Sequence, residues 1–362
     1  MERNDLFVAE RFSKITGVGL YLPSAVSNDE LVSFGVASSD EWIVQRTGIK
    51  QRRVASRGEG VDFMAIEAGR RALEMANANL ERKAQMIIVS TNTASTLEKS
   101  RAGFPAVGAY VQNSLKEFVE FECGFFDVVS GCSGVNYGLA IGDSFIKAGL
   151  YDRVLVVGAD RLWGITDLDE RGTASVLSDG ASGYVLDVSD SPGFIAHKLR
   201  GRGECRSAIT SELMNRRSIF EPNGEKIFSP AIQMNGREVY KFVVNLLVDT
   251  FAGFNTDDEI NPLNYRISIS GVRKIAAHQA NLRMFEAAAD RICEMPELGL
   301  SRQDVLDRII TTIQVNANSS VASQGPPTYE ILFGEKKVEE GSHILMMGYG
   351  AGLSWGINHY IA

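Results

Sequence analysis

The chain has 362 residues, of which 44% are hydrophobic and 23% are charged, and these fractions are typical of globular proteins with one or two cores. A formal net charge of −8 argues against nucleic acid as a partner. No run of 18 apolar residues occurs, so we expect no transmembrane helix.

The cysteines are few and are scattered through the chain without a CxxC pair. This spacing argues against a zinc site and against a disulfide framework, and it is typical of a reducing compartment. Residues 1–14 carry charges throughout and do not resemble a signal peptide. We therefore expect a cytoplasmic protein that binds no metal. The four cysteines are Cys123, Cys132, Cys205 and Cys293.

Helical stretches alternate with short apolar runs along the chain. Several runs are continuously apolar, which is typical of strands buried on both faces. This order predicts an α/β protein in which helices cover a mostly parallel sheet. The expected strands are 86–90, 154–157, 183–187 and 343–347, and the expected helices are 62–78, 135–148 and 239–251.

The two halves of the chain resemble each other loosely. In each half a buried strand leads into a glycine-rich turn, at 157–160 and at 347–350. Each half also has a reactive side chain at the expected start of a helix, Cys132 in one and His278 in the other. These features suggest duplication of one α/β unit. The predicted halves are 1–190, with the nucleophile, and 191–362, with a histidine and an asparagine.

Cys132 is the most informative residue, because the turn Ser130–Gly134 separates an apolar run from an amphipathic stretch. A thiol at a helix N-terminus is favoured as the reactive thiolate. The alternative is a packed core thiol, since free cysteine behaves as a small buried hydrophobe. His278 and Asn318 lie far downstream. A cysteine with a distant histidine and asparagine indicates thioester chemistry, although a core histidine and a turn asparagine are the simpler alternatives.

Several separate motifs occur in one order along most of the chain, from about Ile15 to Gly356. Together they resemble the β-ketoacyl-acyl carrier protein synthase III family of the thiolase superfamily. The motifs are Asp40–Ile49 (DEWIVQRTGI), Ser130–Gly134 (SGCSG), Glu170–Thr173, Ser178–Ala181, Met234–Val239, His278–Asn281, Asn318–Ser323 and Gly350–Gly356.

The resemblance implies a five-layered α-β-α-β-α thiolase fold, whose two similar halves are related by a pseudo-two-fold axis, and usually a homodimer. It implies that a cysteine takes an acyl group from a CoA or phosphopantetheine thioester. A malonyl thioester on acyl carrier protein is then decarboxylated, and its carbanion attacks the acyl-enzyme. No permanently bound cofactor is implied. The pathway is fatty-acid initiation or specialised polyketide and secondary-metabolite synthesis.

The resemblance also assigns roles to residues of this chain. Cys132 is the nucleophile, and His278 and Asn318 donate hydrogen bonds to the enolate. The backbone N–H groups of Cys132 and Ala351 form the oxyanion hole, where glycines allow close approach. The remaining assignments are Trp42, Arg46, Arg171 and Asn281 for CoA and pantetheine, Lys241 and Arg283 for carrier protein, and Phe104 and Tyr349 for the acyl pocket. For these residues, ordinary packing and solvated surface charge are the alternatives.

One departure concerns the residue before Asn318, where the family usually has glycine and this chain has Ala317. Two other functions compete with condensation. One is an acyltransferase on the same fold that loads Cys132 without chain extension, and the other is a partner subunit of a ketosynthase heterodimer. The presence of both His278 and Asn318 favours condensation, and an intact Cys132 argues against a non-catalytic subunit.

Overall fold

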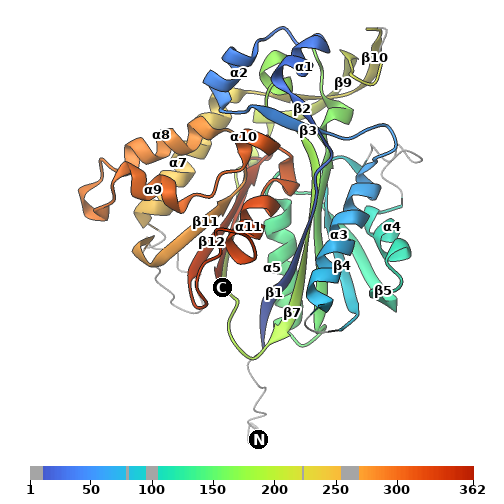
Figure 1. The fold of residues 1–362 in the computed structure, drawn as a ribbon, viewed down its shortest axis with the longest axis vertical. Helices are drawn as coiled ribbons and strands as arrows, with labels where there is room; N and C mark the ends of the chain where they lie inside the picture. Colours follow the sequence, from blue (N-terminus) through green and yellow to red (C-terminus); the bar gives the residue numbers. More distant parts are fainter. Residues whose placement is uncertain (1–10, 79–80, 95–104, 222–223, 254–268) are drawn as a thin grey trace, which may run out of the picture.

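The computed structural model describes residues 11–78, 81–94, 105–221, 224–253 and 269–362. Figure 1 shows two sheets with helices between them and on their outer faces. The first sheet has the strand order β1-β7-β6-β4-β5, and the second has the order β11-β12-β13-β8. The strands are β1 (Phe12–Tyr21), β4 (Ala84–Ser90), β5 (Val119–Val128), β6 (Arg153–Arg161), β7 (Asp179–Ser189), β8 (Phe194–Gly201), β11 (Val272–Ala277), β12 (His343–Gly350) and β13 (Ser354–Ile361).

Both sheets are mixed rather than mostly parallel. In the first, β5, β4 and β6 run parallel, whereas β7 is antiparallel to β6 and to β1. In the second, β11 and β12 are parallel, and β13 is antiparallel to β12 and to β8. The expectation of a mostly parallel sheet is therefore wrong. Helices cover both faces of these sheets, so antiparallel strands are as continuously apolar as parallel ones.

The sheets and helices form five layers, as predicted. Helices α3 (Val61–Asn77) and α4 (Val107–Ser114) pack on the outer face of the first sheet. Between the sheets lie α5 (Gly134–Lys147) and α11 (Gly325–Leu332), which contact strands of both. The outer face of the second sheet is covered by α7 (Gly236–Gly253), α8 (Leu282–Ile292) and α9 (Arg302–Arg308).

The smaller elements gather over one end of the two sheets, at the top of Figure 1. Their core includes Ile43, Trp163 and Ala317, all fully or nearly fully buried. These elements are β2 (Ser24–Ser27), α1 (Asn28–Ser33), α2 (Asp40–Thr47), β3 (Gln51–Val54), α6 (Arg171–Ala174), β9 (Ile209–Arg217), β10 (Lys226–Met234) and α10 (Ile313–Asn316). Elsewhere in the fold, short 3₁₀ turns occur at Leu162–Ile165, Gly203–Ala208, Ile269–Gly271, Pro296–Leu298 and Ser320–Ala322.

The predicted strands and helices are all present, but the two glycine-rich turns are not where we expected them. Residues 158–160 continue β6, and residues 348–350 continue β12, so the second turn begins only at Ala351. Close packing explains the glycine at 158, because a Cβ there would lie 2.8 Å from the Val321 carbonyl oxygen. The chain passes from the first sheet to the second between Ser189 and Phe194.

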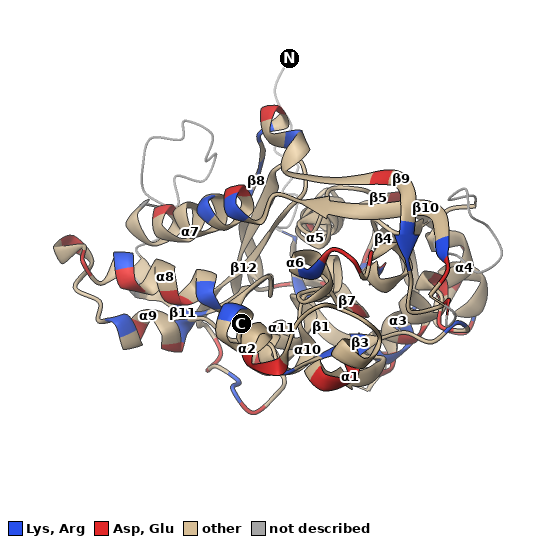
Figure 2. Cartoon of the chain, turned by 90° about the horizontal axis from the view of Figure 1, so that it is seen from above, with Lys and Arg blue, Asp and Glu red and all other residues tan. Residues whose placement is uncertain are grey.

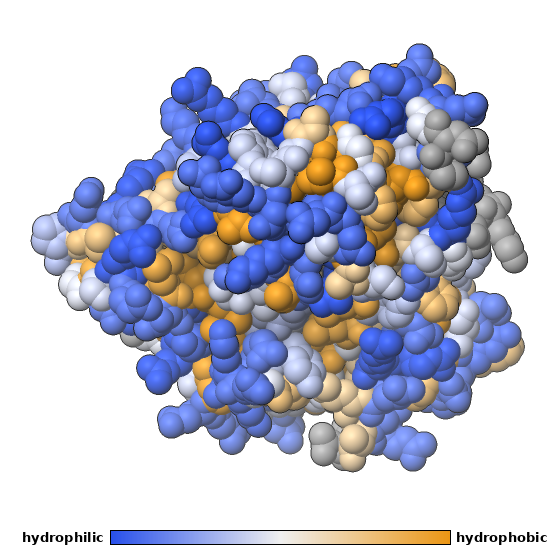
Figure 3. Space-filling model, turned by 45° about the horizontal axis from the view of Figure 1, so that its top comes forward, coloured by the Kyte–Doolittle hydropathy of each residue, from blue (hydrophilic) through white to orange (hydrophobic). Residues whose placement is uncertain are grey.

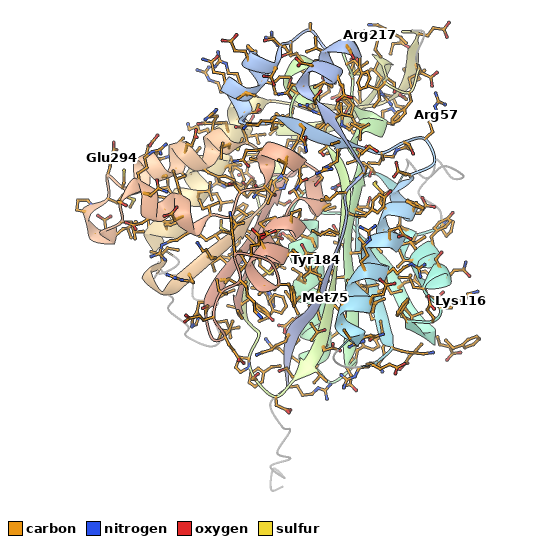
Figure 4. The ribbon with its side chains drawn as sticks, in the orientation of Figure 1. Arg57, Met75, Lys116, Tyr184, Arg217 and Glu294 are labelled. Atoms are coloured by element: carbon orange, nitrogen blue, oxygen red, sulfur yellow. The ribbon has the colours of Figure 1, made fainter. Side chains whose placement is uncertain are left out.

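The exterior is mixed in polarity. Figure 3 shows a hydrophilic surface over most of one face, with apolar patches towards its middle. In Figure 4, Tyr184 of β7 lies in the interior, whereas Arg57, Lys116 and Glu294 extend from the periphery. Within the described residues, every helix is too short or too polar to cross a lipid bilayer.

Candidate active site

Cys132 lies in the tight turn that joins β5 to α5. Gly131 has a φ of +54°, which glycine adopts without strain. The hydroxyl of Ser133, the N-cap of α5, donates to the Ser130 carbonyl at 2.8 Å and lies 2.9 Å from the Ser354 hydroxyl. The turn is thereby fixed to the start of β13. The predicted strand, turn and helix around Cys132 are confirmed.

The turn after β12 packs directly against Cys132. A Cβ added to Gly350 would lie 2.6 Å from the Cys132 nitrogen and 2.9 Å from its sulfur. A Cβ on Gly131 would lie 2.7 Å from the Ala351 nitrogen. Glycine at both positions therefore lets two backbone segments meet beside the thiol, with the nitrogens of Cys132 and Ala351 near each other.

His278 is the first residue after β11, and its backbone N–H donates to the Met347 carbonyl at 2.7 Å. The prediction that it begins a helix is wrong. Helix α8 starts only at Leu282, because Asn281 is its N-cap and accepts a hydrogen bond from the Arg283 N–H. His278 instead occupies the loop between strand and helix, as Cys132 does in the other half.

The His278 ring is buried and held on several sides. Its Nδ1 lies 2.5 Å from the Ser323 hydroxyl, and the ring packs against Tyr349 in a T-shaped arrangement at a centroid distance of 5.1 Å. The Tyr349 hydroxyl donates to the His278 carbonyl at 2.7 Å. Burial lowers the pKa of His278 to about 3, so the imidazole is neutral at physiological pH.

Asn318 is fixed through both its backbone and its side chain. Its N–H donates to the Val176 carbonyl at 2.9 Å, and its carbonyl accepts from the Ser178 N–H at 2.8 Å. The side-chain Oδ1 accepts the Ser320 N–H at 2.9 Å. Since the amide oxygen is engaged in the loop, the orientation of the Nδ2 donor is set as well.

Ser320 connects the three candidate catalytic residues, although its residue type and position do not single it out. Its hydroxyl donates to Cys132 Sγ at 3.2 Å, its N–H donates to Asn318, and its backbone hydrogen-bonds the His278 ring. Its φ of +52° is uncommon for a residue with a side chain. Serine beside asparagine is ordinary turn chemistry, so only the folded chain shows this role.

The expected depression of the Cys132 pKa is wrong. Burial is the main reason why the pKa of this thiol is raised to about 12; the hydrogen bond from Ser320 opposes this rise, and the Asp160 carboxylate adds to it. His278 is neutral and supplies no positive charge, and α5 begins two residues beyond the thiol. The resting site therefore contains a neutral thiol and a neutral imidazole.

We call the residues assigned to CoA the rim: Arg46 and Arg171 are exposed, Trp42 and Asn281 are half-buried, and their contacts differ. The Arg171 guanidinium lies over the Trp42 ring, 4.2 Å from its centroid, which is a cation–π geometry. Arg46 is exposed in the last turn of α2. The Asn281 amide caps α8 and also donates to the Arg46 carbonyl at 3.3 Å, so it joins two helices.

The two residues assigned to carrier-protein binding also differ. Arg283 is held by Glu286 and by the backbone carbonyls of Val44 and Gln45, so it links α8 to α2. Lys241 is exposed on α7. Figure 2 shows both basic and acidic segments on α7 and on α8.

The acyl-pocket assignments remain predictions. Phe104 lies outside the described residues. Tyr349 is buried, and its described contacts are with His278.

Comparison with known proteins identifies the family. Residues 126–203 match the family described as 3-oxoacyl-[acyl-carrier-protein] synthase III, and residues 264–360 match its C-terminal part. The β-ketoacyl-[acyl-carrier-protein] synthase III of Neisseria meningitidis serogroup A is 34% identical over 347 residues, which cover 96% of this chain and 98% of that protein. The chain belongs to the β-ketoacyl-[acyl-carrier-protein] synthase III family. It is a condensing enzyme with acyltransferase chemistry, as predicted.

Solved structures of the synthase III family agree with this assignment. The enzyme of Aquifex aeolicus has 31% identity and a TM-score of 0.75, covering 97% of this chain and 100% of its own. The priming β-ketosynthase from the R1128 polyketide biosynthetic pathway has 28% identity and a TM-score of 0.78, covering 99% and 98%. Their likeness extends over almost the whole chain, so the predicted thiolase fold is confirmed.

Proposed function

We propose that this synthase loads an acyl group onto Cys132 and extends it with a malonyl thioester carried by acyl carrier protein. The observation that supports this most strongly is that Cys132, Asn318 and His278 are all hydrogen-bonded to one residue, Ser320. A nucleophile and two neutral donors are thus held in one small, largely buried volume.

In the first half-reaction, the Cys132 sulfur attacks the carbonyl carbon of an acyl-CoA or acyl-carrier thioester. The new carbon–sulfur bond forms while the old one breaks, and the departing CoA thiolate takes up a proton. Because the resting thiol is protonated, its own proton must leave during the attack. Cys132 loses one proton as the departing thiolate takes one up, so the step releases no net proton. The oxyanion is held by the backbone N–H groups of Cys132 and Ala351.

In the second half-reaction, loss of CO₂ from the malonyl thioester leaves negative charge on its carbonyl oxygen. We assign two neutral donors to that oxygen, the Asn318 Nδ2 group and the His278 Nε2–H. Ser323 accepts the Gln279 N–H at 3.2 Å, which leaves its own proton free to point to His278 Nδ1 and to keep the ring proton on Nε2. The carbanion attacks the acyl carbon, a β-ketoacyl thioester forms, and Cys132 leaves as thiolate.

The rim supplies substrate binding in this proposal. Trp42 stacks on the adenine ring of CoA, and Arg46 and Arg171 reach its phosphate or ring. Lys241 and Arg283 contact an acidic carrier protein, and Asn281 borders the pantetheine entrance. Tyr349, with Phe104, closes the acyl pocket against water. CoA and phosphopantetheine thioesters are substrates here, and no resident cofactor takes part.

A homodimer is also part of the proposal. Strand β5 is the last strand of the first sheet, and several of its apolar side chains are exposed. Phe121 is 96% exposed and Phe125 is 42% exposed, and Val129 beyond the strand is 76% exposed. An apolar sheet edge is a template for pairing with another strand, and a second copy of β5 would cover it.

Three further assignments belong to the proposal: the division into halves, the location and the pathway. The strands of the first sheet lie within 12–189 and those of the second within 194–361, which supports the division into halves 1–190 and 191–362. All four cysteines are free thiols, which supports a reducing, cytoplasmic location. Similarity to a polyketide priming ketosynthase supports a specialised pathway beside fatty-acid initiation.

Intact-protein mass spectrometry tests the proposed function. Wild type and Cys132→Ala are incubated with acyl-CoAs and acyl-carrier proteins of graded length, and malonyl carrier protein is then added. We expect an adduct only in the wild type, which disappears with release of a β-ketoacyl product. An adduct that persists would support acyl transfer without extension. Condensation by Cys132→Ala would contradict the proposal.

A further inference from the structure

A chain of hydrogen bonds leads from a buried carboxylate to the Cys132 sulfur. Asp160, on β6, is fully buried and accepts the backbone N–H and the Nδ2 group of Asn92 at 2.7 and 2.9 Å. Asn92 Nδ2 also donates to the Ser320 hydroxyl at 3.3 Å. The Ser320 hydroxyl then donates to Cys132 Sγ at 3.2 Å. The path thus runs through carboxylate, amide, hydroxyl and thiol.

The chemistry of these groups sets the direction of the bonds that Asn92 makes. A carboxylate only accepts, so Asn92 must turn its NH₂ group, and not its oxygen, towards Asp160. That group carries two hydrogens, one for Asp160 and one for Ser320. The Ser320 oxygen accepts one of these hydrogens, and its single proton is directed at Cys132. Two further hydroxyls, those of Thr91 and Thr93, donate to Asp160 and hold it in place.

We propose that Ser320 is a further catalytic residue, whose hydroxyl stabilises the Cys132 thiolate as it forms and as it leaves, and that Asn92 and Asp160 are positioning residues that aim this hydroxyl. The inference rests on the proposed role of Cys132 as nucleophile. Burial disfavours the thiolate strongly, and a hydrogen bond from a donor that faces the sulfur favours it. The left-handed backbone of Ser320 fits this role, because it lets one residue serve the sulfur, Asn318 and His278 together.

The pH range for a test follows from the titratable groups around the thiol. These are Asp160 from β6, His278 after β11 and Tyr349 from β12. Burial lowers the pKa of His278 to about 3 and raises the pKa of Tyr349 far above its usual value. Neither His278 nor Tyr349 changes charge between pH 7 and 9.5. The thiolate fraction of Cys132 therefore controls any reaction of its sulfur in that range.

The experiment measures the rate at which iodoacetamide alkylates Cys132 in the full-length enzyme between pH 7 and 9.5, with peptide mapping to separate the other cysteines. In Ser320→Ala we expect the rate to fall about tenfold at each pH, equivalent to a pKa about one unit higher. Ser319→Ala removes a hydroxyl from the same buried segment and leaves the rate within about twofold of wild type. An unchanged rate in Ser320→Ala would overturn the proposal.

A double-mutant cycle tests the positioning role. Asn92→Ala keeps the Ser320 hydroxyl but removes its orienting donor, so we expect a smaller loss, about threefold. In the Ser320→Ala background, Asn92→Ala should cause no further loss. Equal losses in both backgrounds would show that Asn92 does not act through Ser320 and would contradict the chain. Because alkylation needs no turnover, this result is independent of whether Cys132→Ala abolishes condensation.

Discussion

The interior around Cys132 contains neutral groups, whereas the rim around Trp42 carries positive charge. In the interior, a neutral thiol and a neutral imidazole are held by hydrogen bonds to Ser320. At the rim, the Arg171 guanidinium lies over an indole and other cations are exposed. The difference indicates that the two regions have different roles. In the proposed function, the interior stabilises charge that exists only during the reaction, and the rim attracts charge that the substrate carries permanently.

The largest effect is expected from crowding the interior. In Gly350→Ala the new methyl group would lie within 3 Å of the Cys132 nitrogen and sulfur, so the nucleophile turn and the Ala351 N–H must separate. We expect condensation to slow by about 10²–10³, the typical cost of a lost oxyanion donor. Gly203→Ala is the control, because a Cβ there has no neighbour within 4 Å and should leave the rate unchanged. Equal rates for both variants would contradict the oxyanion assignment.

A smaller effect, and one of another kind, is expected at the rim. Arg171→Ala removes the cation that lies over Trp42, and a cation–π contact is worth about 0.5–2 kcal/mol. We expect KM for acyl-CoA to rise several-fold while kcat stays close to that of wild type. Steady-state kinetics at low and high salt measure both constants. A fall in kcat with unchanged KM would place Arg171 in the chemistry and would remove the contrast between the two regions.

A modest gain in stability is expected at the loop that carries Asn318. Ala317 has φ +51° and ψ −154°, a backbone conformation that glycine adopts far more easily. This explains why the family usually has glycine there. Ala317→Gly should raise the free energy of unfolding by about 1 kcal/mol. This is the backbone strain that glycine relieves, minus the larger conformational entropy that glycine loses on folding. Chemical denaturation measures this, and a loss of stability would show that the alanine methyl packs too well to remove.

The smallest expected effect is an absence of pH dependence. The pKa of His278 is lowered by burial to about 3, so the imidazole stays neutral from pH 8 down to 5.5. The decarboxylation rate should therefore show no step near pH 6.5.

The stability should depend on pH, because the unfolded histidine gains a proton near pH 6.5 whereas the folded one gains it only near pH 3. The free energy of unfolding therefore decreases as pH falls from about 6.5 to about 3. His278→Gln should reduce this decrease.

Local patterns predicted much of this molecule. Continuous apolar runs located the buried strands, and the turn around Cys132 was readable because a strand, small residues and an amphipathic stretch follow each other. Strand direction was not readable, since helices cover both sheets and bury all strands alike. The raised pKa of the Cys132 thiol was also missed. It depends on burial and on Asp160, which is close only in the folded chain.

Ser320 and Asn92 show the same limit of sequence reasoning. They lie 228 positions apart, and their hydrogen bond is made only when β4 and β6 meet the loop after α10. Serine in that loop indicates a turn and nothing more, and its positive φ cannot be inferred from the residue type. The donors around a nucleophile are therefore the part of this site that needed three-dimensional structure.

The most direct test of this account follows the fate of the acyl group on Cys132 by intact-protein mass spectrometry in His278→Ala and Asn318→Ala. Both variants keep the nucleophile but lose a donor to the enolate. We predict that both form the acyl adduct and that it persists after malonyl carrier protein is added, whereas wild type clears it. An adduct that clears in these variants as fast as in wild type would contradict the assignment of His278 and Asn318 to decarboxylation.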